Sequence, residues 1–226
     1  MEERGMNERI RRLRKQSTET QAHIDMERAR YFTEAYRRYE GEVSIPELRA
    51  LSLKHYFANK TICIEDGELI VGEKGSGPQA APTFPDLCCH TVDDLKIMNE
   101  RDLINFKVQE EDYIFQEEII PYWEKRSIRH KILMHMTPEW KRAYGAGIFT
   151  EFMEQRGPGH TVGSENIYTR GFLDHKRDIK KRLDRLDYFN DPEAMNKEAE
   201  LKGMDIACDA ILLLASRYAE LAECMA

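Results

Sequence analysis

The segment that begins at Asp191-Pro192 constrains the fold more than any other part of the chain, because it predicts one long helix. Proline fits the first turn of a helix, so Asp-Pro is a start signal. Apolar residues then recur at helical spacing in two adjacent stripes, one of Ala207, Ile211, Leu214, Tyr218 and Ala222 and the other of Ile206, Ala210 and Leu213. This face is wider than a surface helix needs. We therefore expect a helix packed against others, with a face that no later element of this chain covers.

The same segment is not expected to span a membrane. Between residues 204 and 222 it carries Asp205, Asp209, Arg217 and Glu220, and charges are costly at the centre of a bilayer. The N-terminus has acidic residues beside its arginines and no apolar run, which fits neither a secretory signal nor a transit peptide. We expect a cytoplasmic protein without a membrane partner.

Helical spacing dominates the rest of the chain and predicts a mainly α fold. Asp25, Thr91 and Thr137 are good N-caps, and each precedes a stretch with helical spacing. Ser44-Ile45-Pro46 starts another helix, with proline near its first turn. The predicted helices cover residues 26–39, 44–59, 91–102, 110–135, 137 to 145 or 147, 172–188 and the final segment.

One of these helices contains a proline. Pro121 lies inside the 110–135 stretch and removes a backbone donor, so we expect a kink or break near Ile120. The stretch from 172 to 188 is highly charged, and it turns Leu183 and Leu186 inward.

A small two-stranded β element is predicted between Thr61 and Val71. Residues 61–64 and 69–71 are short β-prone runs, and Asp66-Gly67 between them is a strong hairpin signal. Residues 72–85 are rich in glycine and proline, and they predict an irregular loop that is ordered only by packing. The fold class expected from the residues is therefore mainly α with a small two-stranded β element.

Charge and cysteine usage exclude several kinds of partner and cofactor. The net charge of -7 disfavours nucleic acid and anionic membranes as partners. The five cysteines are odd in number and form no C-x-x-C pair, which argues against a disulfide framework and a zinc knuckle. Cys88-Cys89-His90 lacks a chelating spacer, so we interpret its cysteines as buried or incidental thiols. No metal and no bound cofactor are predicted for this chain.

The candidate site is the run from Phe149 to Thr161, FTEFMEQRGPGHT, which ends in a Gly-Pro-Gly turn. Such a turn fixes the position of one titratable side chain, here His160, whose imidazole can donate or accept a hydrogen bond near neutral pH. Phe149 and Phe152 precede it at helical spacing, so they are core residues by default and the wall of an apolar pocket in the alternative interpretation. Elsewhere the chain offers no H-E-x-x-H or G-x-S-x-G motif.

Three stretches together resemble glycyl radical enzymes of the pyruvate formate-lyase type: residues 44–50 (SIPELRA), 66–73 (DGELIVGE) and 150–161 (TEFMEQRGPGHT). The resemblance spans nearly the whole chain. It implies the N-terminal helical part of an α/β barrel of two five-stranded half-sheets. Over residues 1–226 we expect an incomplete pyruvate formate-lyase-like domain, without the barrel core, the radical cysteine loop and the glycyl radical domain.

Within that family, residues 88–91 (CCHT), 137–140 (TPEW) and 207–210 (ACDA) resemble the dehydratases that act on trans-4-hydroxy-L-proline. The resemblance implies that His160 contacts the substrate near its leaving hydroxyl group and that Phe152 packs against the substrate ring. Gly163-Ser164 departs from the family continuation after the turn. Related glycerol and diol dehydratases also carry a histidine in a similar turn.

The resemblance also implies partners. The parent enzyme is expected to be a homodimer that carries a glycyl radical installed by a radical S-adenosylmethionine activating enzyme, and this chain needs the remainder of the barrel. Alone it is predicted to be inactive. The alternatives are a noncatalytic truncated product, a docking subunit of a split glycyl radical enzyme, or part of a diol or glycerol dehydratase or of a formate C-acetyltransferase-like enzyme.

Overall fold

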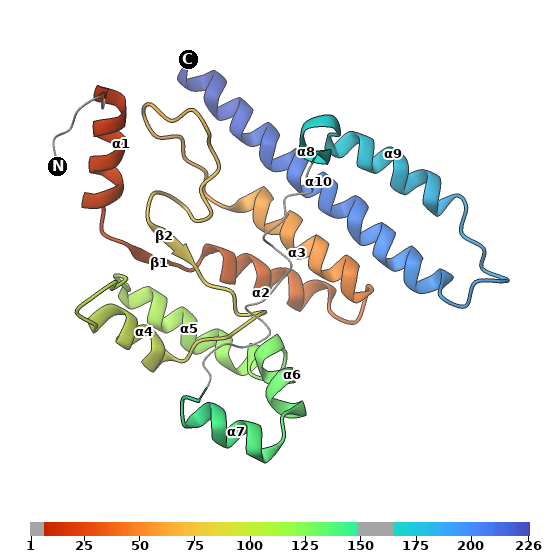
Figure 1. Ribbon diagram of the computed structural model, residues 1–226, viewed down its shortest axis with the longest axis horizontal. Coiled ribbons are helices and arrows are strands. Elements are labelled where there is room, and N and C mark those ends of the chain that lie inside the picture. Colours follow the sequence, from red (N-terminus) through yellow and green to blue (C-terminus); the bar gives the residue numbers. More distant parts are fainter. Residues whose placement is uncertain (1–6, 149–164) are drawn as a thin grey trace. The chain divides into compact units, whose positions relative to one another are not determined.

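The computed structural model describes residues 7–148 and 165–226, and these residues form helices and one small parallel sheet (Figure 1). In chain order the elements are α1 (Glu8–Glu19), β1 (His23–Asp25), α2 (Glu27–Tyr39), α3 (Ile45–Asn59), β2 (Ala80–Pro82), α4 (Val92–Glu100), α5 (Glu110–Trp123), α6 (Ile128–His135), α7 (Pro138–Gly145), α8 (Asn166–Thr169), α9 (Phe172–Leu183) and α10 (Ala194–Met225). The predicted fold class, mainly α with a two-stranded element, is confirmed. Among the described residues no helix is both long and apolar enough to cross a bilayer.

Local capping signals fix several helix starts where the sequence predicts them. Ser44 caps α3 and Thr91 caps α4, and each forms a reciprocal capping box with the acidic residue three positions later. The Thr137 side chain accepts a hydrogen bond from the backbone N–H of Trp140 at the start of α7. These caps satisfy backbone donors that a helix start leaves unpaired, so local sequence suffices to place them.

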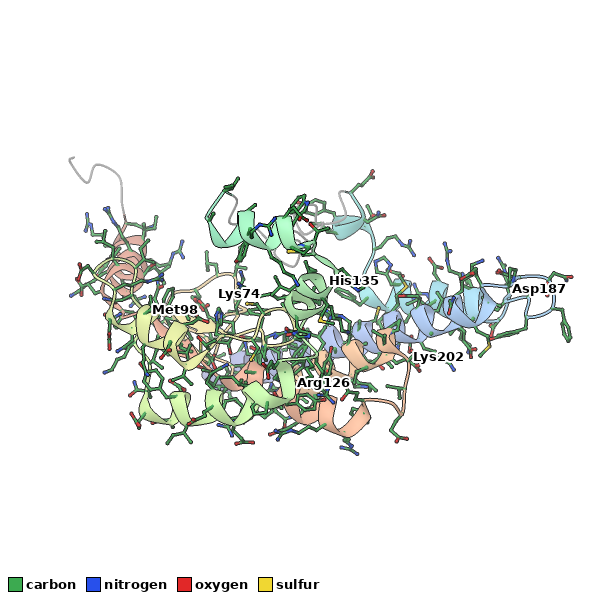
Figure 2. All side chains as sticks on the ribbon, turned by 90° about the horizontal axis from the view of Figure 1, so that it is seen from below. Lys74, Met98, Arg126, His135, Asp187 and Lys202 are labelled. Carbon is green, nitrogen blue, oxygen red and sulfur yellow. The ribbon has the colours of Figure 1, made fainter. Side chains whose placement is uncertain are left out.

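Two predicted helix boundaries are wrong. The break expected near Ile120 lies after Trp123, because α5 continues through Pro121, and the buried side chain of Trp123 favours completing the last turn. The helix predicted to reach residue 188 ends at Leu183. Beyond this end, the Asp187 carboxylate accepts hydrogen bonds from the backbone N–H groups of Phe189 and Asn190, both at 3.0 Å. These bonds favour a turn over further helix. Asp187 lies in the connection between α9 and α10 (Figure 2).

The predicted hairpin is also wrong, because the two strands come from elsewhere. β1 and β2 pair in parallel, with His23 opposite Ala80 and Asp25 opposite Pro82. Asp66-Gly67 does form a tight turn, in which Gly67 has a φ of +87°. This turn does not connect two paired strands. It contacts α1 instead, where the Arg9 side chain donates a hydrogen bond to the Gly67 carbonyl at 2.9 Å. Tertiary hydrogen bonds thus replace the local strand pairing that the turn signal predicts.

The loop that follows the turn is held by buried polar groups of neighbouring elements. Lys60, which is 1% exposed, donates from Nζ to the carbonyls of Glu73 and Lys74 at 2.6 and 3.1 Å. The Tyr56 hydroxyl also donates to the Lys74 carbonyl, at 2.7 Å, and the Asp25 carboxylate accepts from the Ser76 N–H at 2.6 Å. Burial lowers the pKa of Lys60. The loop is therefore ordered by contacts outside itself, as predicted.

The described chain divides into two compact units, residues 1–82 with 170–226 and residues 83–169. In the first unit α3 packs against both α2 and α10, and α10 also packs against α9. Lys176 of α9 forms ion pairs with Asp205 and Asp209 of α10, both at 2.8 Å. The wide apolar face of α10 is thus partly covered by two helices of its own chain, while Met204 remains 55% exposed.

The second unit has a small core of its own. α4 packs against α5, and Leu95, Ile119 and Trp123 are fully buried. Gln116, which is 2% exposed, donates from its side chain to the carbonyl of His90 at 2.6 Å. This bond ties α5 to the segment that precedes α4.

Replacing Gly203 with leucine is expected to lower the free energy of unfolding of the chain by about 1–3 kcal/mol, as overpacking of a core does. A Cβ atom at Gly203 would lie 3.0 Å from the backbone of Pro46, so a side chain there pushes α10 away from α3. Leucine has a higher helix propensity than glycine, so a loss of stability in this variant would come from packing and not from helix propensity.

Urea denaturation followed by far-ultraviolet circular dichroism measures this loss. Gly145→Leu is the matched control, because a Cβ atom at Gly145 in α7 has no neighbour within 4 Å. Equal stability of the two variants would contradict the close approach of α10 to α3.

Candidate active site

The predicted site residues Phe152 and His160 lie outside the described residues, which stop at 148 and resume at 165. Their roles therefore stay predictions. The structure does describe the elements on both sides of this segment, and each is fixed by specific hydrogen bonds.

The helix that precedes this segment, α7, has a well-defined C-terminal end. Gly147 has a φ of +71°, and its N–H donates to the Tyr144 carbonyl while the Ile148 N–H donates to the Ala143 carbonyl, both at 3.0 Å. These two bonds form a Schellman motif, which closes α7 and favours glycine at the left-handed position. The predicted helix end near residue 145 or 147 is confirmed.

The longer helix that follows this segment, α9, has a well-defined N-terminal start. Arg170 forms an ion pair with Asp178 of α9, and this bond lowers the pKa of the Asp178 carboxyl group. The Asp174 carboxylate accepts from the Gly171 N–H at 2.8 Å and so caps the first turn of α9. The backbone is therefore anchored to α9 from Arg170 onward, nine positions after the end of the candidate run at Thr161.

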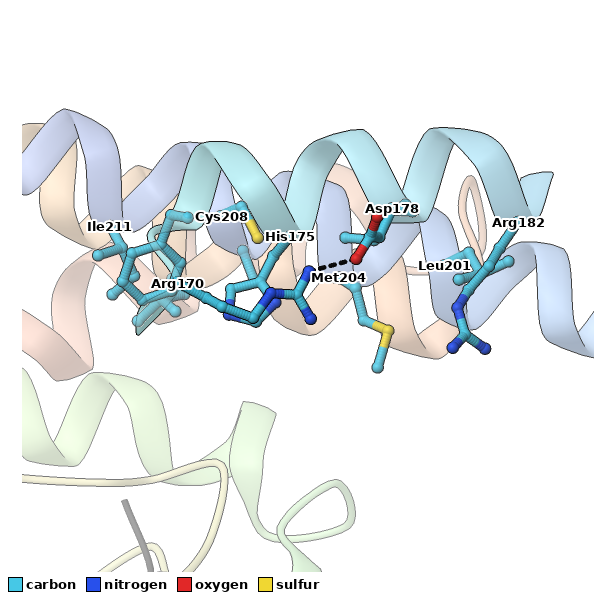
Figure 3. A pocket seen from close by; sticks show the side chains of 12 residues that line it. Arg170, His175, Asp178, Arg182, Leu201, Met204, Cys208 and Ile211 are labelled. Carbon is cyan, nitrogen blue, oxygen red and sulfur yellow. Dashed lines mark hydrogen bonds and ion pairs between the residues drawn. The ribbon is translucent and has the colours of Figure 1, made fainter. Parts of the chain in front are cut away.

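An open groove of about 580 Å³ lies along α9, α10 and α3 (Figure 3). Its lining is mostly apolar, with charged or polar side chains contributed by α9 and by Arg170, two residues before it. The lining residues are Leu53, Arg170, Phe172, His175, Asp178, Ile179, Arg182, Leu201, Met204, Ala207, Cys208 and Ile211. Figure 3 shows the Arg170 side chain reaching Asp178 past His175.

This groove is better suited to binding than to acid–base or nucleophilic chemistry. Its thiol, Cys208, is 7% exposed, and burial raises the pKa of that thiol, so it stays protonated near neutral pH. Its carboxylate, Asp178, is already paired with Arg170. The groove was not predicted from the sequence, although Phe172, His175 and Ile179 have the spacing of one helical face.

The Cys88-Cys89-His90 run is held by hydrogen bonds within the second unit. Arg129 donates to the Cys88 sulfur at 3.3 Å, and Gln116 donates to the Cys89 sulfur at 3.4 Å. Burial raises the pKa of Cys89 to about 11 and lowers the pKa of His90. Among residues 7–148 and 165–226, no group of three or more histidine, cysteine, aspartate or glutamate side chains could hold a metal ion. The arrangement agrees with structural thiols.

The model of the family described as pyruvate formate lyase-like matches residues 6–226, which is nearly the whole chain. The chain belongs to this family. Its pyruvate formate lyase-like sequence is 58% identical over 224 residues to the trans-4-hydroxy-L-proline dehydratase of Clostridioides difficile. That alignment includes 99% of this chain and 28% of the relative.

Solved structures give the same relationship. The crystal structure of the Clostridioides difficile hydroxyproline dehydratase with trans-4-hydroxy-L-proline bound has a TM-score of 0.92 and 57% identity, over 98% of this chain and 28% of that one. A glycyl radical enzyme from Archaeoglobus fulgidus has a TM-score of 0.86 and 27% identity, over 96% of this chain and 28% of that one. The chain therefore spans about 28% of the length of these relatives and has the fold of this part of glycyl radical enzymes, as the sequence motifs predict.

Cys89 is expected to be alkylated at least about 100-fold more slowly than the exposed Cys224 in the native chain at about pH 8. A thiol with a pKa of about 11 is only about 0.1% ionised there, whereas an ordinary thiol is roughly one quarter ionised. The rate at Cys89 should rise roughly tenfold per pH unit toward its pKa.

Peptide mass spectrometry after timed treatment with iodoacetamide gives both rates in one sample. Chain unfolded in guanidinium is the control, in which the two rates should converge. Equal rates in the native chain would contradict a half-buried, protonated Cys89.

Proposed function

We propose that this chain forms the N-terminal part of a glycyl radical dehydratase that eliminates water from trans-4-hydroxy-L-proline. The 58% identity to the Clostridioides difficile dehydratase, which extends over 99% of this chain, carries the proposal. By comparison, a probable dehydratase of Escherichia coli is 30% identical over 88% of the chain. The much higher identity supports the same substrate and not merely the same class of reaction.

The proposed role of this chain in the reaction is to supply one wall of the site and a proton. A glycyl radical on polypeptide beyond this chain, installed by a radical S-adenosylmethionine activating enzyme, supplies the radical chemistry. His160 donates a proton to the departing hydroxyl group, so that water leaves in place of hydroxide. Phe152 packs against the pyrrolidine ring and holds the leaving hydroxyl group toward the imidazole.

The segment that carries His160 lies between two well-defined helix ends. The Schellman motif at Gly147 and the cap at Gly171 hold the backbone on both sides of the candidate run. The activity requires the remainder of the barrel, and the working enzyme is proposed to be a homodimer.

A chimera tests the substrate. This chain replaces the matching part of the Clostridioides difficile dehydratase, and the chimera is activated anaerobically and assayed with trans-4-hydroxy-L-proline, glycerol and 1,2-propanediol. We expect turnover of trans-4-hydroxy-L-proline alone, measured as formation of the pyrroline carboxylate. Electron paramagnetic resonance confirms that the radical is present. A radical-bearing chimera that dehydrates only a diol would overturn the proposed substrate, and one that dehydrates nothing would favour a noncatalytic chain.

His160→Ala in the chimera is expected to lower the rate of dehydration at least about 100-fold, the usual contribution of a general acid, without changing the amount of glycyl radical. His135→Ala is the matched control, because His135 is an exposed histidine at the end of α6. Unchanged turnover by the His160 variant would remove this residue from the mechanism.

Phe152→Ala is expected to raise KM for trans-4-hydroxy-L-proline more than it lowers kcat, because it removes apolar contact with the ring and leaves the proton donor in place. Steady-state kinetics of the activated chimera separate the two effects. A kcat loss as large as that of the His160 variant, with KM unchanged, would contradict this role.

A further inference from the structure

The helix α1 differs from α2, α3 and α10 of the same unit, because none of its residues is buried. Each of the other three helices buries several side chains. A helix of 12 residues is only marginally stable in water by itself, and most helices in proteins are stabilised by packing of an apolar face. The position of α1 therefore depends mainly on polar contacts.

The polar contacts of α1 reach the loop between residues 65 and 79. They join Arg9 to the Gly67 carbonyl at 2.9 Å, Arg12 to the Asp66 carboxylate at 2.6 Å, Gln16 to the Glu65 carboxylate, and the Ser17 carbonyl to the Gln79 side chain at 2.9 Å. The side chains of Arg12 and Asp66 are 53% and 81% exposed, so water competes for both. Exposed ion pairs of this kind contribute little to stability.

Helix and loop carry opposite charges. The helix contains Arg9, Arg11, Arg12, Arg14 and Lys15 against Glu8 and Glu19, whereas residues 65–73 contain Glu65, Asp66, Glu68 and Glu73 and no basic residue. Dissolved ions screen the attraction between exposed charges. A groove of about 480 Å³ lies between helix and loop, and its lining includes Leu13, Leu69 and Ile70. The two elements are thus held by charge across a space that their side chains do not fill.

The turn at residues 65–68 depends on α1 in return. Within the part of the chain that the structure describes, the hydrogen bonds and ion pairs from this turn to other elements go to α1. The loop from 73 to 76 is held separately, by Lys60, Tyr56 and Asp25. Residues 20–22, between α1 and β1, form neither helix nor strand, and β1 is paired with β2. Separation of α1 from the turn therefore leaves the sheet and the 73–76 segment in place.

We propose that α1 is a detachable helix, which leaves the 65–79 loop with residues 20–22 as its pivot while the rest of the first unit stays folded. Regions held by few buried apolar contacts are the ones that open first in a native protein. Opening separates the arginines from the acidic turn and exposes the apolar side chains that line the groove. Ionic strength and the charge of either element set how often the helix is detached. The inference does not depend on the proposed function.

Hydrogen–deuterium exchange of the full chain, followed by mass spectrometry of its peptides, tests whether α1 opens separately. We expect the backbone amides of α1 to exchange at least about 100-fold faster than those of α3, after correction for their intrinsic rates. Protection of α3 in the same sample shows that the first unit is folded. Equal protection of α1 and α3 would overturn the proposal.

Charge exchange tests what holds the helix. Arg12→Glu is expected to speed exchange in α1 about two- to fivefold, the effect of losing an exposed ion pair, and Asp66→Arg added to it should restore the slower rate. Arg11→Glu is the matched control, because Arg11 is an exposed residue of the same helix and lies away from the face that carries Arg9 and Arg12. Glutamate at either position relieves repulsion among the basic residues of α1, so faster exchange reports lost docking and not a weaker helix.

Salt gives a second measure of the same contact. Raising its concentration from about 20 mM to about 500 mM is expected to speed exchange in α1 more in the wild-type chain than in the Arg12→Glu variant, because the variant has no ion pair with Asp66 left to screen.

Each contrary result has a definite meaning. Failure of Asp66→Arg to restore the rate, or equal effects of Arg11→Glu and Arg12→Glu, would overturn docking by charge. Faster exchange in α3 that accompanies every change in α1 would show that the two open together and would overturn a detachable helix. Where α3 of the isolated chain is itself unprotected, the chimera with the Clostridioides difficile dehydratase takes its place, and the same outcomes decide.

Discussion

The close packing of α10 against α3 is the contact on which the first unit depends. It requires a residue without a side chain at Gly203, where a Cβ atom would meet the Pro46 backbone at 3.0 Å, and it buries Ala210 completely. Because α10 is long, α9 also packs against it, and Lys176 of α9 forms ion pairs with Asp205 and Asp209 of α10. The groove exists because α3 and α9 both pack against α10 without filling the space between them.

Buried polar groups add a second level of order to this helix packing. Lys60 and Tyr56 on or next to α3 satisfy carbonyl groups of the loop after the Gly67 turn, and Arg217 of α10 donates to the carbonyls of Phe57 and Lys60 at 2.5 and 2.9 Å. A buried ammonium group such as that of Lys60 is costly unless it is hydrogen-bonded, and here carbonyl oxygens accept its hydrogen bonds, as they do for the half-buried Arg217. The irregular loop and the end of α3 therefore depend on the position of α10.

The candidate site divides into parts that sequence could and could not provide. Phe152 and His160 were identified from a motif, and they remain predictions because they lie outside the described residues. The fixed ends of their segment, at Gly147 and Gly171, follow local rules for helix ends. The groove was not predicted, because its lining combines α3 with α9 and α10, which lie much later in the sequence, and no local pattern specifies which helix faces pack together.

The sequence by itself determined the helical class, the helix starts at Ser44, Thr91 and Thr137, and the family, because helix-start and motif residues act within a few positions of one another. Tertiary structure decided the pairing of β1 with β2, the docking of the Asp66-Gly67 turn on α1 and the continuation of α5 past Pro121. In each of these cases contacts with distant residues outweigh a local preference, which is worth about 1 kcal/mol for strand propensity and about 3 kcal/mol for proline in a helix interior.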